Sequence, residues 1–94
     1  MNFNTKDELR NEIEKQYKEH PKYIDVTNWD ISNVKDMSFL FANLEDLEEI
    51  KGIDTWNISK LEDACGIFAG CTNLPTGMFD FIQNLMKNDI TIKF

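Results

Sequence analysis

The sequence is poor in the residues that most enzymes and metal sites use. It contains one histidine, His20, and two cysteines, Cys65 and Cys71, which lack the Cys-x-x-Cys spacing of redox and zinc sites. No P-loop, G-x-G-x-x-G segment or D-x-D-x-D-G calcium loop occurs. We therefore expect a protein without enzymatic activity, cofactor or bound metal. Both thiols are expected to be free and buried rather than joined in a disulfide.

Long apolar runs and targeting signals are missing as well. No stretch approaches the roughly 18 apolar residues that a transmembrane helix needs. The polar N-terminus, MNFNTKDELR, does not resemble a secretory signal. If Met1 is the native start, we expect a cytoplasmic protein with no membrane partner.

The sequence does contain enough apolar material for one folded domain. Hydrophobic residues make up 41% of the 94 positions, with seven Phe and two Trp, which argues against a disordered chain. We expect a single domain over residues 1–94. It divides into an N-terminal helical cap (1–23), two successive repeats (24–75) and a C-terminal cap of helix and strand (76–94).

Negative charge is concentrated in the middle of the chain. The net charge is −7, yet residues 1–23 are balanced, and residues 24–80 hold three Lys against eleven Asp or Glu. An acidic surface attracts basic surfaces and repels nucleic acid. The alternative interpretation is that these charges only keep the protein soluble.

The N-terminal segment predicts an amphipathic helix over residues 5–19. Thr5 and Glu8 have the spacing of a capping box. The apolar residues that follow recur every four positions and form one stripe, which consists of Leu9, Ile13 and Tyr17. Pro21 prevents the helix from continuing.

The C-terminal segment predicts a helix over 76–87 and then a strand over 90–94. Thr76 is the expected helix cap, and apolar residues follow it at helical spacing. Asn88-Asp89 breaks the helix. Beyond this break, apolar and polar residues alternate as they do in a strand.

The main feature is an internal repeat in the middle of the chain. Shifting the sequence by 27 aligns residues 29–42 with residues 56–69. The matched pairs include Trp29 with Trp56, Ser32 with Ser59, Asp36 with Asp63, and Leu40-Phe41-Ala42 with Ile67-Phe68-Ala69. Agreement at a residue as rare as Trp indicates a structural repeat, whose copies must stack to bury their apolar faces.

Each copy is predicted to contain a strand, a turn and a short helix. The alternation Trp-x-Ile is typical of an extended segment with both side chains on one face, and the serine that follows suits a turn. Apolar residues at helical spacing then predict a helical turn, formed by Met37, Leu40 and Phe41 in the first copy and by Ala64, Ile67 and Phe68 in the second. We expect Trp29 and Trp56 in the core, and Asp36 and Asp63 in structural roles.

The link between the copies, residues 43–52, combines leucines with acidic residues. Leu44, Leu47 and Ile50 recur in steps of three, which predicts a helical turn with one apolar, buried side. The solvated side carries Glu45, Asp46, Glu48 and Glu49.

These segments resemble a known family. The run WDISNVKDMSFLF, from Trp29 to Phe41, is similar to the W-D-[VT]-S-x-V-x-x-M-x-x-[ML]-F unit of BspA-type bacterial leucine-rich repeat proteins. Residues 68–74, FAGCTNL, are similar to the F-x-G-C-x-x-L segment of the same repeats, whereas Asn57 and Ala64 depart from the pattern. The resemblance covers residues 28–75. It implies an α/β fold, a short leucine-rich-repeat-like solenoid of strand–turn–helix repeats, used for protein binding without catalysis.

We therefore expect a protein–protein interaction module. Its expected binding residues are acidic and lie in the link and in the second copy, at Glu45, Asp46, Glu48, Glu49, Glu62 and Asp63. The expected partner is a protein with a basic surface, and an exposed strand edge offers a route to a homodimer. Direct binding of nucleic acid is not expected.

Two alternatives stay open from the sequence alone. One is a small acidic inhibitor from a phage or mobile element, similar in action to an anti-CRISPR protein, which blocks a nucleic-acid-binding host defence protein by occupying its basic groove. The other is an enzyme that uses a pair of carboxylates, an interpretation that the repeat register does not support.

Overall fold

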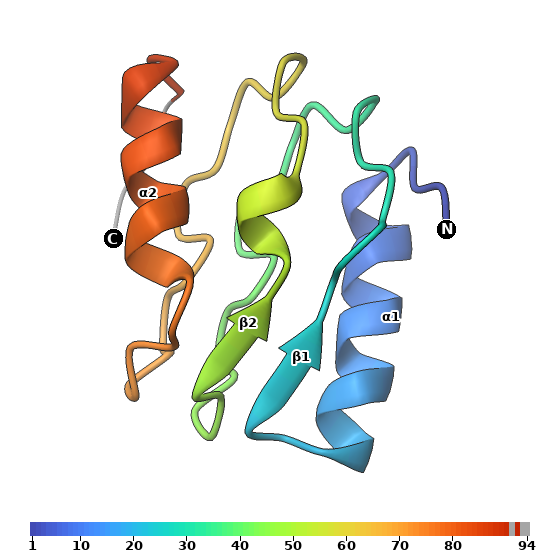
Figure 1. The fold of residues 1–94 in the computed structure, drawn as a ribbon, viewed down its shortest axis with the longest axis vertical. Coiled ribbons are helices and arrows are strands. Elements are labelled where there is room, and N and C mark those ends of the chain that lie inside the picture. The colour runs from blue at the N-terminus through green and yellow to red at the C-terminus, as the bar shows by residue number, and fades with distance from the viewer. Residues whose placement is uncertain (91, 93–94) are drawn as a thin grey trace.

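The fold places two short parallel strands between two helices. The computed structural model describes residues 1–90 and 92. In chain order its elements are α1 (Lys6–Glu19), β1 (Tyr23–Asp25), β2 (Glu49–Lys51), the 3-10 helix η1 (Ile53–Thr55) and α2 (Met78–Lys87). Figure 1 shows α1 at one side of the molecule, α2 at the other, and both strands between them.

Helix α1 forms where the sequence predicts it. The N–H of Glu8 donates to the hydroxyl of Thr5 at 3.3 Å, and the N–H of Thr5 donates to the carboxylate of Glu8 at 3.2 Å, which completes the capping box. Leu9 and Ile13 are fully buried, and Tyr17 packs against the core. The expected helix and its apolar stripe are therefore confirmed.

The sheet is formed by segments that the sequence pattern did not indicate. β1 pairs with β2 in parallel, with Ile24 opposite Ile50. The strands predicted at the two Trp-x-Ile segments were wrong: in the described part of the chain only Asp30 is bridged there, to Asn2. Each true strand has three residues and one buried side chain, which is too short for an alternating pattern to be visible.

A second set of parallel pairings joins the two copies beyond the first turn. Four alternate N–H groups of residues 37–43 donate to carbonyl oxygens of residues 63–69 at 2.7–3.0 Å. The short helices predicted for these segments were wrong, because positive φ angles, which a right-handed helix does not allow, occur at Phe39, Asn43, Gly66 and Gly70. The apolar residues face inward as expected, but the backbone bonds to the neighbouring copy.

The link between the copies is a turn followed by a strand. The N–H of Leu47 donates to the carbonyl of Leu44 at 3.2 Å, and β2 begins two residues later. The helical turn predicted over 43–52 was therefore wrong in type. Its buried side was right, since Leu44, Leu47 and Ile50 are all buried.

The C-terminal helix starts later than predicted. α2 begins at Met78 with Gly77 as its cap, because Thr76 instead pairs with Glu49 beside β2. The break at residues 88–89 is confirmed. Of the strand predicted over 90–94, Ile90 and Ile92 belong to no strand, and residues 91, 93 and 94 lie outside the described residues.

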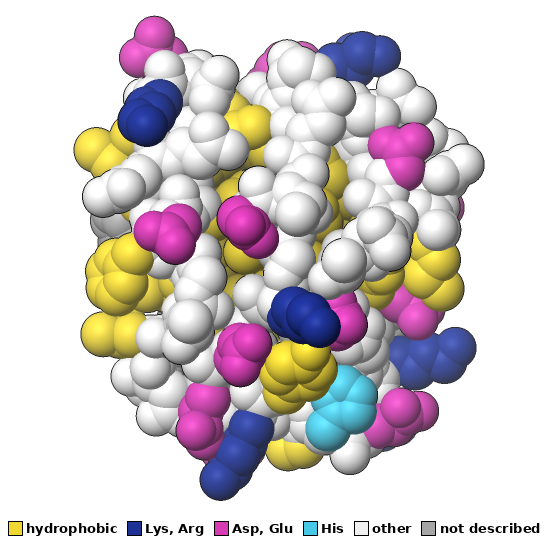
Figure 2. Space-filling view, in the orientation of Figure 1, with side chains coloured by type: hydrophobic (Ala, Val, Ile, Leu, Met, Phe, Trp, Pro, Cys, Tyr) yellow, Lys and Arg dark blue, Asp and Glu magenta, His cyan; other side chains and the backbone are white. Residues whose placement is uncertain are grey.

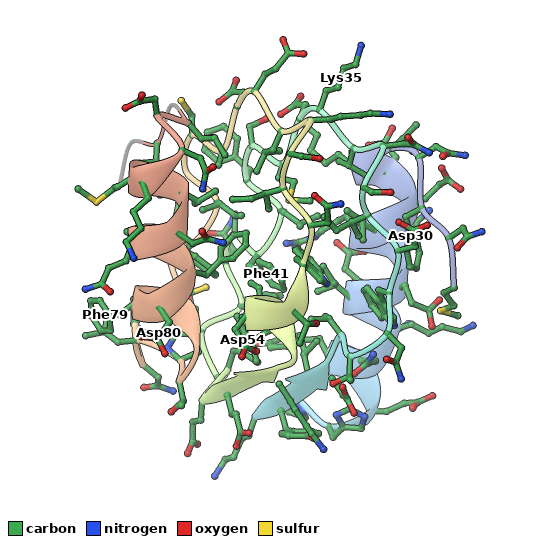
Figure 3. The ribbon with its side chains drawn as sticks, turned by 45° about the horizontal axis from the view of Figure 1, so that its top comes forward. Asp30, Lys35, Phe41, Asp54, Phe79 and Asp80 are labelled. Carbon is green, nitrogen blue, oxygen red and sulfur yellow. The ribbon has the colours of Figure 1, made fainter. Side chains whose placement is uncertain are left out.

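Both copies contribute to one apolar core. Phe41 stacks on Phe68, its equivalent in the second copy, with ring centroids 5.4 Å apart, and Figure 3 shows Phe41 in the interior between the helices. Trp56 is buried and contacts Phe41 and the edge of Phe81. The expected core position is confirmed for Trp56 and holds only in part for Trp29, which is half-buried.

Side chains of α1 bond to the open backbone edge of the first copy. The amide of Gln16 donates to the carbonyl of Asp25 at 2.8 Å and accepts its N–H at 2.9 Å, as a neighbouring strand would. The guanidinium of Arg10 donates to the carbonyls of Leu40 and Ala42 at 3.0 and 2.9 Å. Because unpaired backbone groups at a sheet edge need partners, α1 closes this edge.

We expect Arg10→Ala to lower the free energy of unfolding by about 2 kcal/mol, since hydrogen bonds to a charged group contribute roughly 1.5–3 kcal/mol. Urea denaturation measures this loss. Lys15→Ala, at an exposed position of the same helix, is the matched control and should change stability by less than roughly 0.5 kcal/mol. Equal losses in the two variants would contradict the bonding role of Arg10.

Two glycines with positive φ differ in what faces them. A Cβ on Gly66 would lie 2.4 Å from the ring of Phe39, which is 59% exposed and can move aside. A Cβ on Gly52 would lie 2.7 Å from the backbone N and Cα of Thr27, which cannot move without shifting the chain.

Gly66→Ala should therefore cost about 1–2 kcal/mol, mainly for the positive φ, and Gly52→Ala should cost more. Chemical denaturation of both variants tests the order. The double variant F39A/G66A should regain part of the lost stability, because the steric contact is removed. It should not regain all of it, because the unfavourable φ remains. The opposite ranking of the two glycines would show that Thr27 yields more easily than its position indicates.

Candidate binding surface

Four of the predicted binding residues form a turn with a fixed backbone and exposed side chains. This acidic turn comprises Glu45, Asp46, Glu48 and Glu49. The N–H groups of Glu48 and Glu49 donate to the carbonyl of Lys22 at 2.8 and 3.0 Å. The N–H of Asp46 donates to the hydroxyl of Tyr17 at 3.2 Å. The four carboxylates therefore project from a turn that α1 and the start of β1 hold in place.

The second copy contacts the acidic turn from its other side. The side-chain amide of Asn73 donates to the carbonyl of Glu45 at 3.1 Å. The carboxylate of Glu48 lies 3.5 Å from the ammonium of Lys22, and both side chains are more than half exposed. An exposed pair of this kind contributes little stability, so the negative charge of the turn stays available to a partner.

A groove of about 520 Å³ lies beside the turn, between α1 and residues 43–44. Its helical wall carries Arg10, Lys15 and Lys18 as well as Glu14. Positive and negative side chains therefore lie near each other at this end of the molecule, as Figure 2 also shows at its lower edge. The sequence pattern did not reveal this, because the cations belong to α1 and lie far ahead of the acidic turn along the chain.

The other two predicted binding residues lie elsewhere. Figure 1 places residues 44–47 at the lower end of the molecule and residues 59–62 at the upper end. There the N–H of Glu62 donates to the carbonyl of Lys35 at 2.8 Å, and Asp63 accepts the N–H of Cys65 at 2.9 Å. The six predicted residues therefore do not share one surface.

Carboxylates at the corners of the repeat fix its turns. Asp30, Asp36 and Asp63, and the amide oxygen of Asn57, each accept the N–H two residues later at 2.8–3.0 Å. Equivalent positions of the two copies carry the same bond, and Asp36 lies opposite Asp63 in a parallel bridge. The structural role expected for these two aspartates is confirmed.

These bonds lower the pKa of two corner carboxyls. The pKa of Asp30 falls below its ordinary value because the hydroxyl and N–H of Ser32 donate to the carboxylate, the hydroxyl at 2.6 Å. The pKa of Asp36 is lowered by the N–H of Ser38 and, more weakly, by the ammonium of Lys6 at 3.3 Å. The charged form of each carboxyl is therefore the one that the fold favours.

Few other groups among the described residues have positions that suit catalysis or metal binding. His20 is exposed and its ring contacts the carbonyl of Tyr23. Asp54 and Asp80 line one surface hollow of about 310 Å³ between η1 and α2, and Figure 3 labels both residues. No cluster of three or more His, Cys, Asp or Glu suited to a metal occurs within residues 1–90 and 92.

Cys65 and Cys71 are not joined to each other in a disulfide. Cys71 is buried, its thiol donates to the carbonyl of Phe41 at 3.0 Å, and burial raises its pKa. Cys65 is only partly buried, so the expectation of burial is confirmed for Cys71 alone.

Comparison with protein families identifies the group to which this sequence belongs. A family model described as "Mycoplasma protein of unknown function, DUF285" matches residues 8–91. The chain belongs to this family. The match includes β1, β2, η1, α2 and nearly all of α1, and it therefore spans both copies of the repeat.

No curated protein and no solved structure gives a significant match to this DUF285 chain. No helix in the described part of the chain is long and apolar enough to cross a membrane. The family description assigns no activity.

The corner carboxyls predict a loss of stability in acid. Because the pKa of Asp30 and of Asp36 is lower in the folded state, both stabilise the fold above their ordinary pKa of 3.8. This contribution is lost as the pH falls through the lowered folded values. Thermal unfolding followed from neutral to strongly acidic pH should show a decreasing Tm below the ordinary pKa.

The double variant D30N/D36N should lose less Tm in acid, because an amide oxygen accepts the same bond without titrating, as Asn57 already does at 3.0 Å. Asp54→Asn, an exposed control, should lose as much Tm in acid as the native chain. A double variant that loses as much Tm in acid as the native chain would rule out these two carboxyls as the cause.

Proposed function

We propose that the chain is a protein-interaction module built from two successive coils of a leucine-rich-repeat-type solenoid. Three observations support the stacked arrangement: the parallel bridge between Asp36 and Asp63, the bridge between Glu49 and Thr76, and the stacking of Phe41 on Phe68. Each joins residues 27 positions apart. The resemblance of residues 28–75 to BspA-type repeats leads to the same arrangement, and proteins with such repeats use their surfaces for binding.

The proposed contact surface is the acidic turn. The observation that carries this proposal is the combination of a backbone fixed by Lys22, Tyr17 and Asn73 with four exposed carboxylates. A preformed turn loses little conformational entropy when it binds. Its chemical complement is a protein surface rich in Lys and Arg.

We propose a binding role rather than a catalytic one, without cofactor or metal. The aspartates that recur in the repeat accept backbone hydrogen bonds at the corners of the fold. Asp54 and Asp80 lie in an open surface hollow that also contains Lys87, where solvent weakens the effect of one charge on another. These environments suit structural and solvated carboxylates.

A narrower form of the proposal is an acidic inhibitor of a nucleic-acid-binding protein. Four carboxylates within five residues give the acidic turn a charge density that resembles a short run of phosphates. Such a turn fits a groove that otherwise holds a nucleic acid backbone. Release of a DNA oligonucleotide from a basic peptide would distinguish such an inhibitor from a general interaction module.

Neutralising the acidic turn should weaken binding to a basic surface. A short fluorescent lysine-rich peptide serves as the probe, with anisotropy as the readout. The variant E45Q/D46N/E48Q/E49Q should bind at least about tenfold more weakly than the native chain, and added salt should weaken native binding by screening. For the inhibitor form, the native chain should also release a DNA oligonucleotide from the same peptide.

The matched control, D7N/D54N/D80N/D89N, removes the same charge from exposed positions outside the acidic turn. It should retain most of the native affinity. If both variants bind equally weakly, net charge alone explains binding and the acidic turn is not a specific contact surface.

A further inference from the structure

Helix α2 carries exposed apolar side chains next to its buried face. Met78, Phe81, Ile82 and Leu85 are buried, whereas Phe79 and Met86 are 60% and 62% exposed. These two residues are seven positions apart, so they lie on the same side of the helix, about 10 Å apart along its axis. Figure 2 shows hydrophobic side chains along the margin that α2 occupies, and Figure 3 shows Phe79 pointing away from the body of the molecule.

Two charges of opposite sign form a second stripe beside this apolar pair. Asp80 and Lys87 are also seven positions apart, near the two ends of the same helix, and both are exposed. Neither takes part in a salt bridge with another described residue. α2 therefore presents two neighbouring stripes. One is apolar, and the other is negative near the start of the helix and positive near its end.

When one of two copies of α2 is turned end to end, its charges are complementary to those of the other copy. Two copies of α2 packed antiparallel about a twofold axis near Gln83 would place Phe79 against the partner's Met86. The same axis would place Asp80 against the partner's Lys87 at both ends of the contact. A parallel arrangement would instead bring like charges together.

We propose that a second copy of this chain docks on this exposed face of α2, in the antiparallel arrangement. The occupant follows from the charge pattern, because the face complements its own reverse. The role is separate from the acidic turn, which lies outside α2 in the sequence and carries charge of one sign.

The edges of the described sheet are less open to a second copy. Gln16 occupies the backbone groups of Asp25 beside β1. On the other side, the carbonyl of Thr76 accepts the N–H of Ile50 and its N–H donates to the carbonyl of Glu48, each at 2.9 Å. Within residues 1–90 and 92, Phe79 and Met86 stay exposed, so the face of α2 is favoured over the strand edge as the place where two copies meet.

The contact should be weak. A helix of ten residues is about 15 Å long, and its face is smaller than the roughly 800 Å² per partner that stable complexes bury. Sedimentation of the full chain from about 10 µM to about 1 mM should therefore show a concentration-dependent dimer. A monomer across this whole range would overturn the proposal.

Removing the apolar pair should abolish the dimer. Phe79→Ser and Met86→Ser should each raise the dimer Kd at least about tenfold. Phe39→Ser is the matched control, since Phe39 is 59% exposed but lies outside α2, and it should leave Kd unchanged. A dimer that survives both substitutions on α2 would place the contact elsewhere, with the strand edge as the next site to test.

A charge exchange tests the antiparallel arrangement itself. D80K and K87D change the net charge in opposite directions, yet each should weaken the dimer because each sets like charges against one another. The double variant D80K/K87D keeps the native composition and should restore the native Kd. Circular dichroism should show that all variants keep the native helix content. This pairing would be excluded if either single variant had the native dimer Kd, or if the double variant did not regain it.

Discussion

Every backbone group at the edge of the paired segments needs a hydrogen-bond partner, and much of the fold follows from this requirement. The two copies supply partners to each other between residues 37–43 and 63–69. The first copy has no preceding copy, so α1 supplies the missing partners through Gln16 and Arg10. A helix thereby replaces a strand, because the amide of Gln16 offers a donor and an acceptor as a backbone does, and the guanidinium of Arg10 offers donors to two carbonyls.

The corners of the fold meet the same requirement through side chains that are close in the sequence. Where the chain changes direction, an Asp or Asn accepts the N–H two residues later, as Asp36 and Asp63 both do. These carboxylates keep their charge, but each uses one of its acceptor positions to fix a turn. The carboxylates of the acidic turn differ because none of them accepts a backbone hydrogen bond from another described residue, so their acceptor positions stay open to a partner.

The sequence predicts those parts of the fold in which local and tertiary preferences agree. α1 was predicted closely because its cap, its apolar stripe and its stop signal all act within the helix. The segment from Met37 to Phe41 was predicted to be helical, and the error has a clear cause. Its apolar spacing is helical, but Phe39 and Asn43 adopt positive φ, and the backbone bonds that decide the structure run to the equivalent segment of the second copy. Single-sequence patterns record side-chain burial better than long-range backbone pairing.

The same distinction explains the candidate surfaces. Residues 45–49 were selected because they cluster in sequence, and the structure keeps them together since a turn is local. Glu62 and Asp63 were grouped with them by charge alone, although the second copy places them at the opposite end of the molecule. The exposed side of α2 was missed because Phe79 and Met86 lie among the apolar residues whose spacing predicted the helix, and the sequence does not separate the exposed ones from the buried ones. Only packing distinguishes them from Ile82 and Leu85, and a helix that covers one end of a core buries one side and leaves the adjoining side in solvent. Apolar residues on that adjoining side stay largely in solvent in the monomer, and the proposed second copy would bury them further.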